Sequence, residues 1–459
     1  MTEPSEQQTT QCDVVVIGLG PGGEATATEL AKAGLAVVGI DERLVGGECP
    51  YFGCVPSKMM VRAADSLAEA RRVPDLAGTV EVRPDWSPVA TRIRDEATDD
   101  WDDKVAVQRL EDAGVQFVRG HGRLAGERTV EVDGHRFTAT KGVVINPGTS
   151  PAVPPVKGLA DTPYWTNRDA VRVESLPASL AVIGGGAIGA EMAQAFARFG
   201  VRVTVLEVAD RILAPEEPEA SALLTEVFAR EGIQVMAGVG IDEVSYADGS
   251  FTITVGDQAV VVDKLLVAAG RRPNLSDVGL DTVGLDPGAR VVETDPHLRA
   301  GDGLWAIGDV TGKGAFTHMS MYQSAVAVRD ILGREGPAAQ YRAVPRVTFT
   351  DPEVGSVGMT EKQARDAGLA VRVGHTDLAT STRGWIAGAE GLVKLVEDAD
   401  RGVLVGATSV GPSGGEILSM LTTAVHAEVP TATLRSMVYA YPTFHRAVEE
   451  ALKDLDSGE

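Results

Sequence analysis

Several features are scarce in this sequence, and each scarcity excludes a class of protein. Three cysteines in 459 residues are too few for the disulfide framework of a secreted protein. No stretch approaches the roughly 18 to 20 uninterrupted apolar residues of a membrane-spanning helix. The first ten residues, MTEPSEQQTT, lack the basic start and the apolar run of an export signal. We therefore expect a cytoplasmic protein.

Basic residues are also in the minority. The chain has 42 Lys and Arg against 65 Asp and Glu, which gives a formal net charge of −23 at pH 7. Such a balance repels nucleic acid and anionic lipid. We expect neither nucleic acid nor a membrane among the partners.

What remains is the composition of an ordinary globular protein. Hydrophobic residues make up 44% and charged residues 23% of the chain. A chain of this length has room for two or three domains, each with its own core.

One internal repeat stands out when the chain is compared with itself. The segment DVVVIGLGPGGEATATELAKAGLAVVGIDE, from Asp13, aligns without a gap with SLAVIGGGAIGAEMAQAFARFGVRVTVLEV, from Ser179. Each copy is an apolar run, a G-x-G-x-x-G turn, a helical pattern and a second apolar run that ends in an acid. This pattern predicts strand, turn, helix and strand, twice.

The glycines and the acid of each copy are typical of a dinucleotide site. The first glycine allows a tight turn, the second lets the backbone approach a pyrophosphate, and the third lets helix pack on strand. The terminal carboxylate then accepts a hydrogen bond from a ribose hydroxyl. The residues are Gly18, Gly20, Gly23 and Asp41 in the first copy, and Gly184, Gly186, Gly189 and Glu207 in the second.

Two dinucleotide sites in one chain indicate two redox cofactors that exchange electrons, most simply a flavin and a nicotinamide dinucleotide. Glu207 would repel a 2′-phosphate, and no basic residue follows before Arg211. The sequence therefore favours NADH over NADPH.

A cysteine pair follows the first copy, in GGECPYFGCVPSK from Gly46 to Lys58. In an ideal helix, residues five apart lie roughly 8 to 9 Å apart at Cα, beyond the roughly 7 Å that a disulfide tolerates. If Cys49 and Cys54 are a redox pair, the turn between them must be distorted, and Gly53 makes distortion easy. The alternative is that both are merely small buried residues.

With these segments the sequence resembles the pyridine nucleotide-disulfide oxidoreductases, the family of dihydrolipoamide dehydrogenase, glutathione reductase and mercuric reductase. The resemblance spans nearly the whole chain. Its further landmarks, in order, are VVINPGTSP from Val143, LLVAAGRRPN from Leu265, LWAIGDV from Leu304 and VTFTDPEVGSVGMTE from Val347.

The resemblance implies an α/β fold with two Rossmann-like dinucleotide-binding domains, for FAD and NAD(P)H, and a C-terminal α+β dimerisation domain. The implied segments are an FAD domain in two pieces, 1–160 and 286–340, a nicotinamide domain, 161–285, and a dimerisation domain, 341–459. A homodimer follows from the resemblance, as does a small-molecule electron acceptor. No resident metal site is expected.

The resemblance also implies residue roles. Cys54 would lie against the flavin and Cys49 would meet the substrate, while Asp309 would bind the FAD ribitol. Lys58 and Glu191 match the family's ion pair near the flavin N5. A helix is expected to begin near His318, where its backbone N–H groups would face the flavin. The remaining residues expected to bind cofactor are Gly47, Gly148 and Gly270.

The C-terminal segment departs from the family pattern. Disulfide reductases carry a His-Pro-Thr-x-x-Glu stretch there, whose histidine exchanges protons with the substrate thiol. This chain reads YPTFHR, with Tyr441 at the histidine position and Arg446 at the glutamate position. Tyrosine is a poor general base at neutral pH, and arginine cannot orient a base by accepting a hydrogen bond from it. His445 is a candidate substitute for the missing base, and the alternative is a histidine of the surface or of the dimer interface.

These replacements leave the acceptor open. A disulfide, in the manner of dihydrolipoamide dehydrogenase, is the nearest whole-chain analogy. A metal ion, as in mercuric reductase, or a quinone fits Tyr441 and Arg446 better, although mercuric reductase ends in a cysteine pair and this sequence ends in ALKDLDSGE. Tyr51 and Phe52 either only pack the distorted turn between the cysteines or, with Tyr439 and Tyr441, are candidate walls of a quinone pocket. A redox-sensing flavoprotein is a further alternative.

The sequence thus predicts an FAD-dependent NAD(P)H oxidoreductase that resembles the flavoprotein disulfide reductases. Electrons pass from NADH through FAD and the Cys49 and Cys54 pair to the acceptor.

Overall fold

The computed structural model describes residues 9–455, which form two compact units. Of the polar N-terminal stretch MTEPSEQQTT only residues 9 and 10 are described, and of the C-terminal ALKDLDSGE only residues 451–455. Unit 1 contains residues up to 56, 91–151 and 271–341, and unit 2 contains residues 57–90, 152–270 and 342 onward. Within residues 9–455, no helix is both long and apolar enough to cross a membrane. The finer division into four segments stays a prediction.

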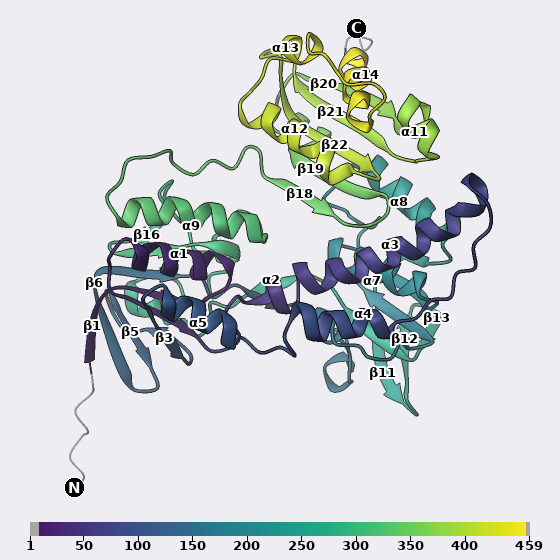
Figure 1. Ribbon diagram of the computed structural model, residues 1–459. Coiled ribbons are helices and arrows are strands. Elements are labelled where there is room, and N and C mark those ends of the chain that lie inside the picture. The colour runs from purple at the N-terminus through teal and green to yellow at the C-terminus, as the bar shows by residue number, and fades with distance from the viewer. Residues whose placement is uncertain (1–8, 456–459) are drawn as a thin grey trace. The chain divides into compact units, whose positions relative to one another are not determined.

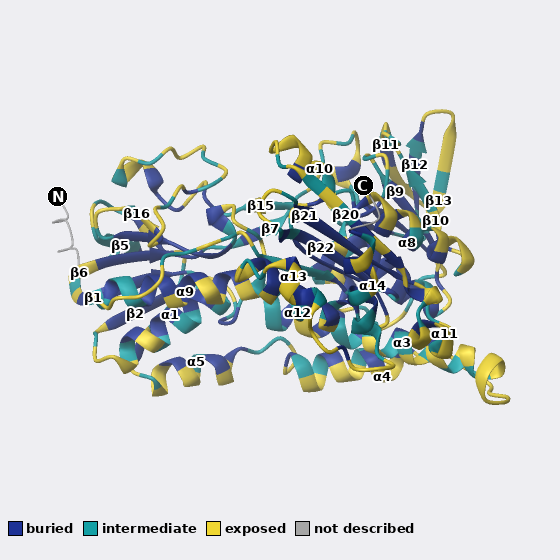
Figure 2. Cartoon of the chain, turned by 90° about the horizontal axis from the view of Figure 1, so that it is seen from above, coloured by how far each residue is buried: buried dark blue, intermediate teal, exposed yellow. Residues whose placement is uncertain are grey.

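The main sheet of unit 1 is built on parallel strands and runs in the order β16-β17-β6-β1-β2-β3, with β4 and β5 attached at β6. Its strands are β1 (Thr9–Ile17), β2 (Val37–Asp41), β3 (Val115–Arg119), β4 (Arg123–Leu124), β5 (Thr129–Val132), β6 (His135–Ile145), β16 (Arg299–Gly301) and β17 (Leu304–Ala306). β2 and the second half of β1, residues 14–17, are buried runs rich in Val and Ile, as expected of parallel strands covered on both faces (Figure 2).

Helices cover one face of this sheet. The helices of unit 1 are α1 (Pro21–Lys32), α2 (Glu48–Tyr51), α5 (Lys104–Asp112) and α9 (Thr317–Ile331), with a π-helical turn at Arg92–Ala97. Figure 1 shows α1 and α9 next to each other, and the hydroxyls of Thr26 and Ser324 hydrogen bond between them at 2.8 Å. Leu30 of α1 and Leu110 of α5 are fully buried in the same core as the sheet residue Val16.

A short antiparallel ribbon completes unit 1. It pairs β7 (Thr149–Pro151) with β15 (Arg271–Pro273). The Asn274 side chain ties the ribbon further, because its Nδ2 donates to the Pro147 carbonyl at 3.0 Å. The ribbon thereby brings together two chain segments that lie far apart in the sequence.

Unit 2 contains the second copy of the repeat. Its parallel sheet has the order β10-β9-β8-β14 and a three-stranded antiparallel sheet, β11-β12-β13, shares its core through Phe251 and Leu206. The strands are β8 (Ser179–Ile183), β9 (Arg202–Glu207), β10 (Gln234–Ala237), β11 (Glu243–Ala247), β12 (Ser250–Val255), β13 (Gln258–Val262) and β14 (Lys264–Val267).

The C-terminal part of unit 2 is an antiparallel sheet packed against helices. The strand order is β18-β19-β22-β21-β20, and Leu395 of β21 packs with Leu421 of α12 and Val448 of α14. The strands are β18 (Pro345–Thr348), β19 (Glu353–Gly358), β20 (Val371–Asp377), β21 (Leu392–Asp398) and β22 (Val403–Gly411).

The helices that lie wholly or mostly in unit 2 are α3 (Cys54–Leu76), α4 (Ser87–Thr91), α6 (Asn167–Ala170), α7 (Ala187–Arg198), α8 (Pro218–Arg230), α10 (Glu361–Asp366), α11 (Thr382–Ala387), α12 (Gly414–His426), α13 (Thr431–Arg435) and α14 (Ala447–Asp454). Short 3-10 turns occur at Leu159–Asp161, Leu280–Val283, Gly308–Thr311, Leu378–Thr380 and Phe444–Arg446. The predicted strand, turn, helix and strand is confirmed in both copies, as β1-α1-β2 and β8-α7-β9.

Candidate active site

The first glycine loop leaves room for an anion at the start of α1. Gly18 has a φ of +87°, and a Cβ on Gly23 would lie 1.9 Å from the Gly18 carbonyl oxygen. Gly20, the N-cap residue of α1, has no side chain that could accept a hydrogen bond from the first helix N–H groups, so no capping side chain satisfies them. Asp41 at the end of β2 accepts from the Leu19 N–H at 2.7 Å.

The second loop repeats this geometry in unit 2. Gly184 has a φ of +105°, a Cβ on Gly189 would lie 1.9 Å from the Gly184 carbonyl oxygen, and Gly186 caps α7 without a side-chain hydrogen bond. Glu207 accepts from the Gly185 N–H at 2.5 Å. Both loops therefore fit a pyrophosphate at an uncapped helix N-terminus, and each acid also holds its own loop.

Arg211, the first basic residue after Glu207, is engaged within its own loop. Its Nη2 donates to the Ala214 carbonyl at 2.8 Å, and its Nη1 lies 3.1 Å from the Asp210 carboxylate. The second oxygen of Glu207 accepts from the Ala209 N–H at 2.7 Å, so the carboxylate is held from both sides.

The cysteine pair lies at a break between two helices of the chain. α2 ends at Tyr51 and α3 begins at Cys54, which is the distorted turn that a redox pair requires at this spacing. A Cβ on Gly53 would meet the Glu48 carbonyl oxygen at 3.1 Å, so this position favours glycine. Cys49 is half-buried and Cys54 is exposed, and both are thiols here.

Thr317, the first residue of α9, connects that helix to the cysteines. Its hydroxyl lies 3.4 Å from the Cys54 sulfur. The hydrogen bond with Cys54, followed by burial, raises the pKa of the Cys49 thiol above its ordinary range. Both effects favour the protonated thiol of Cys49 over its thiolate.

Lys58 and Glu191 form an ion pair inside unit 2. The Lys58 Nζ donates to Glu191 Oε2 at 2.6 Å and lies 4.5 Å from the centre of the Phe349 ring. Glu191 is 5% exposed, and its other oxygen accepts from the Phe349 N–H at 2.9 Å. Because α3 carries Cys54 and Lys58 one helical turn apart, they lie on the same side of this helix.

Asp309 is held by a residue that sequence reasoning missed. Thr149 donates from its hydroxyl to Asp309 Oδ2 at 2.5 Å, and Arg271 donates from Nε to the same hydroxyl at 2.6 Å. Both residues stand in the segments VVINPGTSP and LLVAAGRRPN, so the motifs marked the place without showing the contact. A Cβ on Gly308, just before Asp309, would lie 2.5 Å from Asn146 Oδ1.

The remaining predicted cofactor residues lie at turns or helix starts. Gly47, Gly148 and Gly270 have φ values of +67°, +67° and +108°. A Cβ on Gly47 would lie 2.9 Å from the Gly20 Cα, so the cysteine segment runs directly against the first glycine loop. The helix expected near His318 is confirmed as α9, and exposed His318 stacks on Phe316 with ring centroids 5.1 Å apart.

At the C-terminus, Tyr441 is exposed and its hydroxyl donates to Thr382 Oγ1 at 3.2 Å. Arg446 lies 5.4 Å from the centre of the Tyr441 ring, donates to the Tyr439 carbonyl and pairs with Glu449 at 3.1 Å. The His445 ring contacts the Tyr439 ring at a centroid distance of 6.0 Å. In residues 9–455, no carboxylate hydrogen bonds to His445, so no His-carboxylate dyad forms in this segment.

Two of the candidate walls of a quinone pocket are buried within their own units. Tyr51 is 6% exposed, with Trp101 Nε1 donating to its carbonyl, and Tyr439 is 5% exposed, with its hydroxyl donating to the Leu434 carbonyl. Their rings fill cores of the fold. Two of the four side chains predicted to line a quinone pocket, Tyr51 and Tyr439, therefore pack inside the protein.

Both parts of the chain match known family models. Residues 12–328 match the pyridine nucleotide-disulphide oxidoreductase model, and residues 344–452 match the dimerisation domain of the same family. The chain belongs to the pyridine nucleotide-disulphide oxidoreductases.

Similar proteins in this family differ in their acceptor. Dihydrolipoyl dehydrogenase of Thermus scotoductus is 33% identical over 96% of this chain and 97% of its own length. Mercuric reductase of Acidithiobacillus ferrooxidans is 32% identical over 94% of this chain and 80% of its own length.

Solved structures of family members have the same fold. The HOCl-induced flavoprotein disulfide reductase RclA of Escherichia coli superposes with a TM-score of 0.84 at 26% identity and covers 97% of this chain and 100% of that one. LpdA of Mycobacterium tuberculosis gives 0.85 at 26% identity over 96% and 99%. The predicted α/β class with a dimerisation domain is confirmed.

This pyridine nucleotide-disulphide oxidoreductase is an FAD-dependent NAD(P)H oxidoreductase of the flavoprotein disulfide reductase type. FAD and a pyridine nucleotide are the cofactors that the family implies, and the two uncapped glycine loops fit them. The dimerisation domain and the dihydrolipoyl dehydrogenase relatives support a homodimer.

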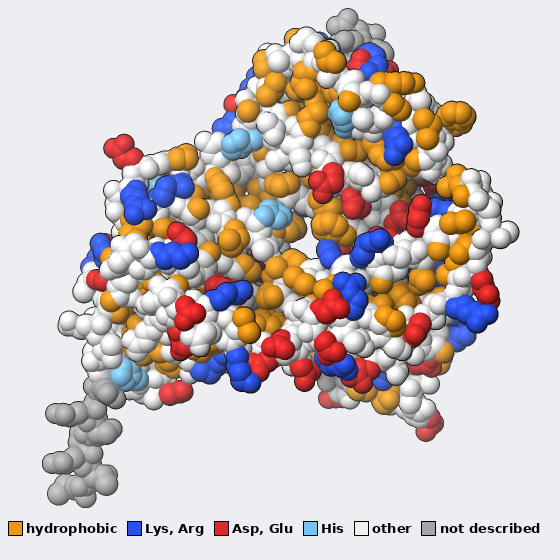
Figure 3. Space-filling view, in the orientation of Figure 1, with side chains coloured by type: hydrophobic (Ala, Val, Ile, Leu, Met, Phe, Trp, Pro, Cys, Tyr) orange, Lys and Arg blue, Asp and Glu red, His pale blue; other side chains and the backbone are white. Residues whose placement is uncertain are grey.

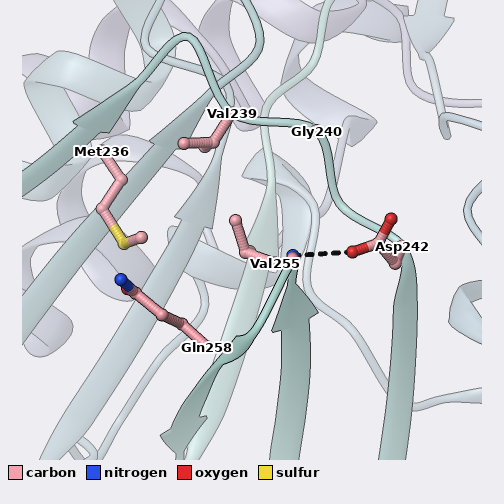
Figure 4. A pocket seen from close by; sticks show the side chains of 7 residues that line it. Met236, Val239, Gly240, Asp242, Val255 and Gln258 are labelled. Atoms are coloured by element: carbon pink, nitrogen blue, oxygen red, sulfur yellow. Dashed lines mark hydrogen bonds between the residues drawn. The ribbon is translucent and has the colours of Figure 1, made fainter.

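Unit 2 has a pocket of about 450 Å³, which is lined by residues of β10, β12 and β13 and of the loops between them. Figure 4 shows Met236 and Gln258 pointing toward one another across it, and Asp242 accepting from the Gly256 N–H at 2.7 Å. None of the predicted site residues lines the pocket. The Asp242 carboxylate already accepts a hydrogen bond from a backbone turn, so we assign the pocket no role.

Proposed function

We propose that this enzyme uses NADH to reduce a thiophilic metal ion, with electrons passing through FAD and the Cys49 and Cys54 pair. The observation that carries the proposal is the C-terminal segment. Tyr441 and Arg446 stand where disulfide reductases have their base and its carboxylate, and no carboxylate orients His445 in residues 9–455.

A metal ion needs no protein base at this step. Disulfide exchange requires a thiolate and a proton donor for the leaving thiol. A thiophilic cation instead displaces the protons of thiols when it binds, so it can engage even a Cys49 thiol whose pKa is raised. Mercuric reductase is a named relative, and RclA has been crystallised as a Cu(II) complex, which supports the proposal.

The roles proposed for individual residues follow the family pattern. Cys49 meets the acceptor and Cys54 lies toward the flavin. Lys58, held by Glu191, places a cation that stabilises negative charge near the flavin N5. Tyr441 is proposed to stand near the acceptor with its hydroxyl held by Thr382, and His445 supports the segment.

The cofactor residues divide between two sites. FAD, when bound, supplies the two-electron relay between the nicotinamide and the disulfide. Its proposed site consists of Gly18, Gly20, Gly23, Asp41, Gly47, Lys58, Gly148, Asp309 and His318. The proposed nicotinamide site consists of Gly184, Gly186, Gly189, Glu207 and Gly270. The four predicted segments and a cytoplasmic location belong to the same proposal.

The step at the cysteines balances. Two thiols become one disulfide, which releases two protons and two electrons. One mercuric ion takes both electrons to give elemental mercury, or two cupric ions take one each to give two cuprous ions. With NADH as the donor, each turnover yields one NAD⁺ and one net proton.

NADH is the proposed nicotinamide. Glu207, the residue proposed to bind the ribose, is held by two backbone N–H groups, and Arg211 is already engaged with its own loop. A 2′-phosphate would meet a carboxylate with no basic partner, so we expect kcat/KM for NADH to exceed that for NADPH by about 100-fold.

A disulfide acceptor is the second candidate, because dihydrolipoyl dehydrogenases match this chain over nearly its whole length. The test is anaerobic NADH oxidation against lipoamide, glutathione disulfide, quinones, thiol-buffered mercuric ion and cupric ion. Elemental mercury is measured by volatilisation and cuprous ion with a chelating dye.

We expect turnover with a metal ion, with two cuprous ions or one mercury atom for each NADH. Cys49→Ala should abolish this turnover, whereas Cys12→Ala, at a buried cysteine of unit 1 outside the site, should retain it. Lipoamide turnover that exceeds metal turnover and depends on Cys49 would overturn the proposal in favour of disulfide reduction.

A further inference from the structure

Asp309 is anchored by a chain of hydrogen bonds within unit 1. Thr149 Oγ1 lies 2.5 Å from Asp309 Oδ2, and Arg271 Nε lies 2.6 Å from Thr149 Oγ1. The direction of both bonds is fixed. Arg271 can only donate and a carboxylate can only accept, so the Thr149 hydroxyl accepts from Arg271 and donates to Asp309.

The anchor leaves half of the carboxylate available. Thr149 is 8% exposed, whereas Asp309 is half-buried. Across residues 9–455, Asp309 Oδ1 accepts from no side chain or backbone group, so this oxygen can serve a ligand hydroxyl. Thr149 therefore fixes one oxygen of Asp309, while the other has no hydrogen-bond partner among residues 9–455.

The guanidinium group of Arg271 makes three contacts. Its Nη2 also donates to the Thr149 carbonyl at 2.7 Å and lies 3.5 Å from the Glu48 carboxylate. Glu48 directly precedes Cys49, and Arg271 directly follows Gly270. The planar guanidinium group of Arg271 thus connects α2, which contains Cys49, with the ribbon of β7 and β15 that carries Thr149.

The geometry points to Arg271 and Thr149 as positioning residues for FAD, which act through Asp309. Thr149 aims the Asp309 carboxylate, and Arg271 orients and polarises the Thr149 hydroxyl. Both residues are predicted to raise the affinity for FAD without touching the flavin themselves. The inference rests on the proposed role of Asp309 at the ribitol.

A double-mutant cycle on FAD binding tests this inference. Apoprotein variants are titrated with FAD, and the dissociation constant is read from flavin fluorescence, with circular dichroism of each apoprotein as the folding control. We expect Thr149→Val and Arg271→Met each to weaken FAD binding about ten-fold. Thr149→Ser, which keeps the hydroxyl, should bind FAD nearly as well as the wild type.

The decisive comparison uses Asp309→Asn. In that background, Thr149→Val and Arg271→Met should cause little further loss, because their effect passes through the carboxylate. Arg272→Met is the matched control, since Arg272 is an exposed arginine on the same strand. It should leave FAD affinity unchanged.

The outcomes separate this inference from the function on which it rests. If Asp309→Asn binds FAD as the wild type does, the proposed role of Asp309 is wrong. If Asp309→Asn binds FAD weakly while Thr149→Val and Arg271→Met bind it normally, only the positioning roles of Thr149 and Arg271 are wrong. Losses that add fully in the Asp309→Asn background would show that the two residues merely hold the ribbon together. Should Thr149→Val fail to fold, Arg271→Met tests the same prediction with Thr149 in place.

Discussion

Lys394 shows how far a single buried charge in this fold depends on its neighbours. It is 2% exposed, and its Nζ lies 3.0 Å from Glu217, 2.7 Å from Glu219 and 2.9 Å from Glu361. Burial alone would lower the pKa of Lys394, but hydrogen bonds to the three carboxylates raise it. The three carboxylates therefore favour the charged ammonium group of Lys394.

Replacing this lysine should be severe. Lys394→Met leaves buried Glu217 without its cation, which we expect to lower the free energy of unfolding by about 3 to 5 kcal/mol. Urea unfolding measures the loss. Lys362→Met removes an exposed pair with Asp366 and should cost no more than about 0.5 kcal/mol. Equal effects of the two variants would contradict this assignment.

Asp65 gives the fold a dependence on pH. Burial raises the pKa of Asp65 to about 6, even though Arg198 lies 2.6 Å away and acts in the opposite direction. Since this value exceeds the ordinary 3.8, the carboxyl group supports the fold fully below about pH 4. This contribution to the free energy of unfolding is lost as the pH rises through about 6.

Asp65→Asn should remove this dependence. The free energy of unfolding of the wild type, relative to Asp65→Asn, should be higher at pH 4 than at pH 7. Urea midpoints at both pH values measure the difference. Glu69→Gln, at an exposed carboxylate on the same helix, serves as the control. A difference that stays constant with pH would contradict the prediction.

At the scale of elements, the second glycine loop contains one glycine that the fold requires and another that we expect only ligand binding to require. A Cβ on Gly189 would lie 1.9 Å from the Gly184 carbonyl oxygen, so Gly189→Ala should push α7 away from β8. We expect a loss of about 1 to 3 kcal/mol in stability, together with loss of NADH binding.

Gly186 offers the opposite case. Its Cβ would meet nothing within 4 Å in the protein, and its φ is −72°, so Gly186→Ala should fold normally. The added methyl would occupy the place where backbone approaches the pyrophosphate, and we expect the NADH dissociation constant to rise at least ten-fold. Gly240→Ala, also with open space around it, is the control. Normal NADH binding by Gly186→Ala would place the pyrophosphate elsewhere.

At the scale of the whole molecule, unit 2 exposes apolar side chains in the segment that matches the dimerisation domain. Val438 is 97% and Trp385 77% exposed, and both lie within the matched residues 344–452. Figure 3 shows hydrophobic side chains gathered, with few acidic ones, over the region of α11 to α14. Such a surface indicates a protein interface.

Val438→Glu should weaken the dimer. A buried, unpaired carboxylate costs about 3 kcal/mol or more, which corresponds to a rise of roughly 100-fold in the dimer dissociation constant. Light scattering after size-exclusion chromatography measures the mass against that of the 48.0 kDa chain. Val261→Glu, at an exposed valine of β13, should leave the dimer intact. A dimer unaffected by Val438→Glu would place the interface elsewhere.

Sequence reasoning succeeded wherever the determinants are local. The glycine loops, the helix break between Cys49 and Cys54 and the start of α9 depend on neighbouring residues, because turn sterics and helix geometry act over a few positions. The family motifs also marked Lys58 and Glu191 in advance. The predicted pairing of these two residues is observed, since the Lys58 Nζ lies 2.6 Å from Glu191 Oε2.

The tertiary structure alone decided the contacts between distant segments. Thr149, Asp309 and Arg271 meet only because β7 pairs with β15 in unit 1, and Lys394 meets Glu217 and Glu361 only inside the core of unit 2. Likewise, the burial of Tyr51 and Tyr439 followed from packing that no local pattern encodes. By itself the sequence determined the family, the two dinucleotide loops and the departures at Tyr441 and Arg446, whereas hydrogen-bond partners and pKa shifts depend on burial that the whole fold creates.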